Sequence, residues 1–181
     1  QEIAKKDQEG RYPIHWAARS NRETDVVSKL LELEEEYHAG KKEKWDADDK
    51  NKDGSEYIEP GRKVTEPDEK GMLPLHLACQ SEAAPITLIK LLLKAYDQRS
   101  EATEKCGGAD QLTQKKELPL QLAIGMENSR SPSVYTDIIL LLIDTYRDGI
   151  HPKQEASLGM VSTAISPFKM LFANQLRMKK L

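Results

Sequence analysis

Hydrophobic residues in this chain gather in three pairs of stretches, each a short stretch followed by a longer one. The short stretches begin at Pro13, Pro74 and Pro119 and run for about two helical turns. Each longer stretch is too apolar to be exposed on all sides, so it must stack on a neighbouring element. The pattern therefore predicts an all-α fold built from three stacked helix pairs. The longer stretches are residues 26–31, 88–93 and 138–143.

The residues before each short stretch predict a turn. Asp7 is followed three positions later by Gly10, and Asp68 by Gly71. Asp bonds readily to its own backbone, and Gly accepts a positive φ, so this spacing is typical of a turn. A proline two or three residues later suits the first turn of a helix, where its missing N–H costs nothing.

Spacing within the units is also shared. Ala17 lies 12 positions before Lys29, and Ala78 lies 12 positions before Lys90. Small residues at these places allow close approach of neighbouring helices, so we expect Ala17, Ala78 and Ala123 to be buried at helix contacts.

This turn–helix–helix pattern resembles the ankyrin repeat. The resemblance covers repeats at about 7–37, 68–97 and 113–148, within an array spanning 1–150. It implies an ankyrin-repeat solenoid, in which histidines such as His15 and His76 bond between the backbones of adjacent turns. It also implies a concave surface, formed by the turns and the first helices, that binds partner proteins.

The sequence departs from the family pattern in two ways. The threonine that would help to cap the first helix and meet the histidine is replaced throughout the array. The third repeat also lacks the usual Asp, Gly and His of the turn and first helix. The replacements are Tyr12, Leu73 and Leu118 in the first case, and Thr113, Lys116 and Gln121 in the second.

Insertions interrupt the period of the array. Asp7 and Asp68 are 61 positions apart, and Asp68 and Thr113 are 45 apart, against a period of about 33 residues. We expect the first insertion, about 39–67, to be a solvated charged loop that contacts a partner or packs back on the array. If the insertion contacts a partner, deleting 40–65 should weaken partner binding. The third repeat has about five extra residues near 127–133, and residues 151–181 form a tail whose helix, beginning near Ser166, caps the array.

The composition of the chain narrows the classes of protein to which it could belong. The 181 residues carry a net charge of −3, which argues against a general nucleic-acid binder. The longest apolar run, 138–143, is far too short to span a bilayer. The two cysteines, Cys79 and Cys106, favour a reducing intracellular compartment, the cytoplasm or an organelle interior. The chain begins with Gln1, so a targeting segment is expected to be missing.

Candidate chemistry is sparse. His15 and His76 have no Cys or carboxylate at ligand spacing beside them and are expected to be structural, and no histidine lies near Cys106 in the sequence. Asp49, Asn51 and Asp53 match the first half of a calcium loop, but Pro60 stands where its bidentate Glu belongs. We therefore expect no enzyme, no cofactor and no metal, and we keep a calcium-responsive regulator that uses 49–53 as the alternative.

The leading hypothesis is a non-catalytic protein–protein interaction module, a structural or scaffold subunit of a larger assembly or peripheral to it. Matching the family's concave surface residue by residue implies partner-binding positions in all three repeats. These are Arg11, Arg19 and Ser20, then Met72, Gln80 and Ser81, then Glu117, Gly125 and Met126.

Overall fold

The structure is a computed structural model that describes residues 5–20, 24–47, 63–99 and 107–149. These residues form six α-helices and no β-strand, which confirms the predicted all-α class. The helices are α1 (Pro13–Ser20), α2 (Thr24–Ala47), α3 (Pro74–Gln80), α4 (Ile86–Arg99), α5 (Pro119–Ile124) and α6 (Pro132–Gly149).

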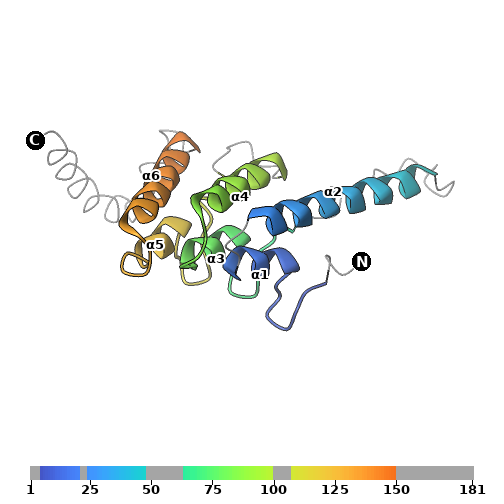
Figure 1. Cartoon of the computed structure of the whole chain (residues 1–181). Helices are drawn as coiled ribbons and strands as arrows, with labels where there is room; N and C mark the ends of the chain where they lie inside the picture. Colours follow the sequence, from blue (N-terminus) through green and yellow to red (C-terminus); the bar gives the residue numbers. More distant parts are fainter. Residues whose placement is uncertain (1–4, 21–23, 48–62, 100–106, 150–181) are drawn as a thin grey trace, which may run out of the picture.

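The helices lie in two rows (Figure 1). The short helices α1, α3 and α5 form one row, and the longer helices α2, α4 and α6 form the other. Each short helix packs on the long helix that follows it, and each helix also contacts its neighbour within the row. The core lies between the rows. Its largest fully buried side chains include Leu88, Ile89 and Leu92 of α4, and Ile138 and Leu142 of α6.

Each short helix is capped by a side chain from its own first turn. The backbone N–H of Tyr12 donates to Nδ1 of His15 at 3.3 Å, and that of Leu73 donates to Nδ1 of His76 at 3.1 Å. At α5 the side-chain amide of Gln121 is the cap, because its Oε1 accepts from the N–H of Leu118 at 2.7 Å. An orphan N–H at each helix start is thus satisfied without the threonine expected from the family pattern.

Burial of the small residues depends on which helices flank them. Ala78 and Ala123 are fully buried, as predicted. The prediction is wrong for Ala17, which is only partly buried, whereas the next residue, Ala18, is fully buried. The difference follows position in the row: α3 packs on the preceding short helix α1, and α5 on α3, whereas among the described residues no helix precedes α1.

Replacing these alanines with leucine should therefore give unequal effects. Ala78→Leu should lower the free energy of unfolding by about 2 kcal/mol, because the added atoms overpack the α1–α3 contact. Ala17→Leu should cost less than about 0.5 kcal/mol, because its side chain borders solvent. Urea denaturation of both variants measures the difference. Equal losses would mean that the two alanines do not differ in their contacts.

The first insertion departs from the expected charged loop. Helix α2 continues to Ala47, so it takes in the first residues of the 39–67 segment, where Lys, Glu and Ala are good helix formers. The last residues of the segment return to the array, since Val64 is buried and the N–H of Lys63 donates to Oε1 of Glu34 at 2.5 Å. The deletion of 40–65 would therefore remove core contacts as well as any partner contact.

Several sequence-based predictions fall outside the described residues. The calcium candidates Asp49, Asn51 and Asp53 lie there, and so does the proposed cap within 151–181. In the part of the chain that is described, no helix is both long enough and apolar enough to cross a membrane.

Candidate functional site

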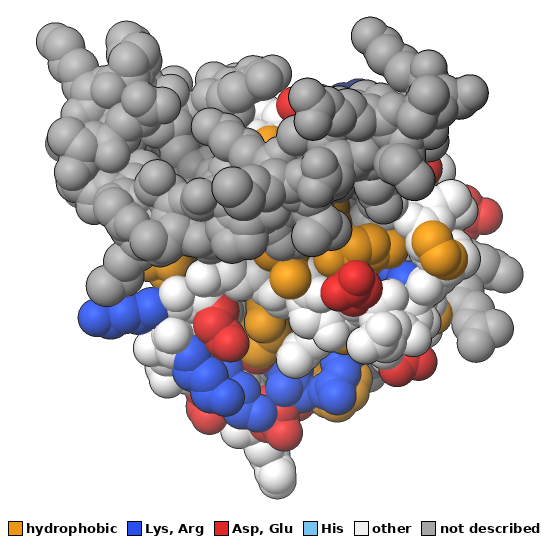
Figure 2. Space-filling view, turned by 90° about the vertical axis from the view of Figure 1, so that its left-hand side faces the viewer, with side chains coloured by type: hydrophobic (Ala, Val, Ile, Leu, Met, Phe, Trp, Pro, Cys, Tyr) orange, Lys and Arg blue, Asp and Glu red, His pale blue; other side chains and the backbone are white. Residues whose placement is uncertain are grey.

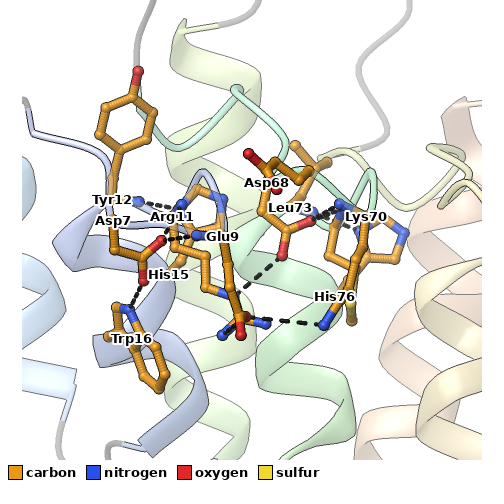
Figure 3. Close-up of polar contacts among 12 residues, drawn as sticks. Asp7, Glu9, Arg11, Tyr12, His15, Trp16, Asp68, Lys70, Leu73 and His76 are labelled. Atoms are coloured by element: carbon orange, nitrogen blue, oxygen red, sulfur yellow. Dashed lines mark hydrogen bonds and ion pairs between the residues drawn. The ribbon is translucent and has the colours of Figure 1, made fainter.

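The turn before α1 is built around the carboxylate of Asp7. Its Oδ1 accepts hydrogen bonds from the backbone N–H groups of Glu9 and Arg11, each at 2.9 Å. Its Oδ2 accepts from the indole Nε1 of Trp16 at 2.7 Å (Figure 3). The N–H donated by Arg11 is the largest influence that holds the pKa of Asp7 below its ordinary value. Both oxygens of this carboxylate thus accept hydrogen bonds, one from the turn and the other from Trp16.

The second turn repeats both backbone contacts, and the third turn keeps one of them. Oδ1 of Asp68 accepts from the N–H groups of Lys70 and Met72, each at 2.8 Å. In the third turn the hydroxyl of Thr113 replaces the carboxylate and accepts from the N–H of Glu117 at 3.2 Å. The third turn therefore keeps this contact without the aspartate, because a hydroxyl oxygen can accept the same backbone bond.

Backbone hydrogen bonds join successive turns. The N–H of Glu69 donates to the carbonyl of Glu9 at 3.1 Å, and the N–H of Gln114 donates to the carbonyl of Lys70 at 3.0 Å. The donors are 45 positions apart, as are Asp68 and Thr113, so the two links fall at equivalent places in their turns. The turns therefore form a continuous stack along the row of short helices.

One position in each turn has a positive φ. Gly10 and Gly71 have φ of 73° and 74°, and Lys116 has φ of 61°. A Cβ added at Gly71 would lie 2.8 Å from the backbone N of Gln114, the donor that joins the third turn to the second. No described turn stacks on the third one, so Lys116 meets only the conformational cost of a left-handed backbone.

Substitutions at this position should have opposite signs in the two turns. Gly71→Ala should lower the free energy of unfolding by about 2 kcal/mol, because it adds left-handed strain and a clash with Gln114. Lys116→Gly should raise it by up to about 1 kcal/mol, because the strain is relieved in open space. Guanidinium melts test both. A destabilised Lys116→Gly variant would show that its side chain makes a stabilising contact.

The two histidines are structural and have unequal surroundings. Because Nδ1 accepts a backbone hydrogen bond in each, Nε2 carries the proton of the neutral ring. Nε2 of His76 bonds to the carbonyl of Gln111 at 3.0 Å, which links adjacent turns as the family resemblance implies. Nε2 of His15 is buried near the carbonyl of Glu66, the position equivalent to Gln111, but makes no hydrogen bond of ordinary geometry among the described residues. Burial lowers the pKa of His15 to about 4 and also lowers the pKa of His76.

A buried ion pair also joins the first two turns. Nε of Arg11 lies 3.2 Å from Oδ2 of Asp68, with both side chains almost fully buried. The Arg11 guanidinium also pairs with Glu9 and lies 4.9 Å from the ring centroid of Trp16. Arg11 is thus a bridge between the turns, as Figure 3 shows, and its charge is neutralised within the chain.

A second arginine performs a different structural task. Arg130 lies between α5 and α6 but reaches back to the carboxyl-terminal end of α3. Its Nε donates to the carbonyl of Ser81 at 3.0 Å, and Nη2 donates to the carbonyls of Ala78 and Cys79 at 2.9 and 3.0 Å. These are carbonyls that a helix end leaves unsatisfied, and a positive charge is favourable there. The sequence showed only extra residues at this place.

The predicted partner-binding positions divide by exposure. Arg19, Ser20, Gln80 and Gly125 are exposed, and Met72, Glu117 and Met126 are partly buried. The expectation of an exposed position is wrong for Arg11 and for Ser81, since both are buried and hold contacts inside the array. Arg11 is buried because it contacts Asp68, and Ser81 because its carbonyl accepts from Arg130. Both partners are distant in the sequence.

One exposed residue that the sequence reasoning missed is Trp16. Its side chain is 43% exposed, whereas the equivalent Leu77 of α3 is only 2% exposed. At the opposite end of the molecule, α6 exposes Leu140, and Leu112 is exposed before the third turn. Viewed from the side of α5 and α6, hydrophobic side chains lie beside charged ones on the described surface (Figure 2).

The described residues offer no group of three or more His, Cys, Asp or Glu that could hold a metal ion. Cys79, fully buried beside Arg130, has a pKa raised to about 12 by burial, so its thiol stays protonated at neutral pH. Comparison with known proteins adds no assignment. No protein-family model matches the chain, and no curated protein matches it.

Proposed function

We propose that the three helix pairs are ankyrin repeats, at about 7–37, 68–97 and 113–148, stacked as a short solenoid whose open end is capped by 151–181. The observation that carries this proposal is the recurrence of one set of turn contacts with different residues. Thr113 replaces Asp68 as acceptor, and Gln121 replaces His76 as the helix cap. Contacts that persist when residue types change indicate a shared backbone geometry rather than a chance likeness of sequence.

We further propose that this array is a non-catalytic protein-binding module, a scaffold subunit in a reducing intracellular compartment. Its turns and the short helices that follow them are fixed by hydrogen bonds and by the buried Arg11–Asp68 pair, so the side chains that project from both are held on a rigid support. Such a support is suited to binding a partner, because little ordering entropy is lost on association. The binding positions are Arg19, Ser20, Gln80, Met72, Glu117 and Met126.

Site-specific photo-crosslinking tests this proposal. A photoreactive residue replaces Gln80, on the proposed surface, and a control replaces Lys90, which is exposed on α4 in the other row. We expect a defined partner to be crosslinked through position 80 and not through position 90. The purified partner should then bind Gln80→Arg at least tenfold more weakly than the original chain, which is about 1.4 kcal/mol. Crosslinks through position 90 alone would overturn the proposed surface.

The calcium-responsive alternative has no support among the described residues. Calorimetric titration of the full chain with calcium would test it directly, since an acidic loop that binds the ion gives a saturable heat that Asp49→Asn and Asp53→Asn remove.

A further inference from the structure

Trp16 is an aromatic side chain that is both exposed and held in place. Its indole is 43% exposed, yet Nε1 donates to Oδ2 of Asp7 at 2.7 Å. The guanidinium of Arg11 lies against the same ring, 4.9 Å from its centroid. An exposed ring would ordinarily lose side-chain freedom when a partner binds, and here that freedom is already restricted.

Arg19 lies one turn further along α1 and contacts the same ring. Its guanidinium carbon is 5.9 Å from the centroid of Trp16, and the residue is exposed. Unlike Arg11, whose charge is taken up by Asp68 and Glu9, Arg19 has no carboxylate partner among the described residues. Trp16 thus lies next to one neutralised cation and one that no described carboxylate neutralises.

We infer that Trp16 and Arg19 form the anchor point for an acidic peptide segment of the partner that carries an aliphatic or aromatic side chain. This inference rests on the proposed protein-binding function and names the class of partner. Trp and Arg are enriched among residues that dominate binding energy, and a planar guanidinium pairs with a carboxylate through two parallel bonds. The apolar side chain of the segment packs on the indole, and its carboxylate binds Arg19.

The surrounding charges favour a short acidic segment over a polyanion. Both oxygens of Asp7 are occupied by the turn and by the indole, so this carboxylate is already engaged close to the anchor. Glu9 pairs with Arg11 and Lys70, and Glu66 pairs with Lys6 and Lys63, so these carboxylates at the same end of the molecule are engaged as well. Because the chain has a net charge of −3, a short segment whose carboxylate binds Arg19 suits this end better than a long phosphate backbone.

Selection from a random dodecapeptide display library, with the full chain as bait, tests the inference. We expect the enriched peptides to be net negative and to contain an aliphatic or aromatic residue. Their affinities for Trp16→Ala and Arg19→Glu should fall at least tenfold. Trp16→Phe should retain most of the affinity, because it keeps a ring. Lys115→Glu, an equal change of charge at the exposed third turn, should change affinity less than twofold.

Enrichment of neutral or basic peptides would overturn the inference. So would acidic peptides that bind Trp16→Ala and Arg19→Glu as tightly as the original chain. Tighter binding to single-stranded oligonucleotides than to any peptide would also overturn it. Circular dichroism of each variant confirms that the helices are intact. If the peptide selection fails, the crosslink through position 80 still tests the proposed protein-binding function separately. A partner captured there but indifferent to Trp16 would preserve the proposed function and remove only this anchor.

Discussion

Replacing Arg130 with methionine should lower the free energy of unfolding by about 3 kcal/mol, the largest loss we expect from a single substitution outside the apolar core. The guanidinium donates to the carbonyls of Ala78, Cys79 and Ser81 at the end of α3. Methionine has similar length but no donor, so buried carbonyls of the α3 end would lose their charged donor. Hydrogen bonds to a charged group contribute about 1.5–3 kcal/mol each, offset here by the cost of burying the guanidinium.

Two further variants separate the effect of the hydrogen bonds to the α3 end from the effect of the positive charge. Arg130→Lys keeps the charge but not the fork of donors, so it should lose about half as much as Arg130→Met. Lys115→Met, an exposed control that removes one charge in the same way, should change stability by less than about 0.5 kcal/mol. Urea denaturation followed by circular dichroism measures all three. A loss below 1 kcal/mol for Arg130→Met would contradict the capping role.

Lowering the pH from 7 to 4 should remove up to about 3 kcal/mol of stability through His15. Burial lowers its pKa from 6.5 to about 4 in the folded chain. Between these values the unfolded chain binds the proton and the folded chain does not, so stability falls as the pH drops through 6.5 towards 4. Protonation would also remove the Nδ1 lone pair that accepts the N–H of Tyr12. The lowered pKa of His76 acts in the same direction.

The chain itself contains the control for this experiment. Gln121 accepts the equivalent backbone hydrogen bond of α5 through its side-chain amide, which does not titrate in this range. His15→Gln should therefore keep the cap and flatten the pH dependence between 7 and 4. Unfolding by urea at half-unit pH steps gives both curves. Parallel curves for the original chain and His15→Gln would show that groups other than His15, such as His76 or the carboxylates, govern the acid loss.

The turns show how far local chemistry can be read from sequence. Asp7, Gly10, Asp68 and Gly71 were assigned to turns because their side-chain and backbone preferences act within a few residues. The third turn departs from this pattern at Thr113 and Lys116, and its geometry is nevertheless kept. A hydroxyl can accept the same bond, and a left-handed lysine is tolerated where no described turn stacks on it.

The site was harder to predict than the fold. Arg11 and Ser81 were placed on the surface because their positions in the repeat pattern are exposed in the family. Their burial depends on Asp68 and Arg130, which lie 57 and 49 positions away. The exposure of Trp16 cannot be read from the repeat pattern, because its equivalent, Leu77, is a core residue and the difference arises from the place of α1 at the end of the row.

By itself, the sequence determined the all-α class, the three helix pairs and the turn positions, because apolar periodicity, proline and glycine act over short distances. Only the tertiary structure decided which of the equivalent residues are buried, how far α2 extends, and that Arg130 caps α3. These features depend on which element lies alongside another, and on polar groups that are distant in the chain and must find partners once they are buried. For the same reason, the surface that remains open to a partner is a property of the packed array.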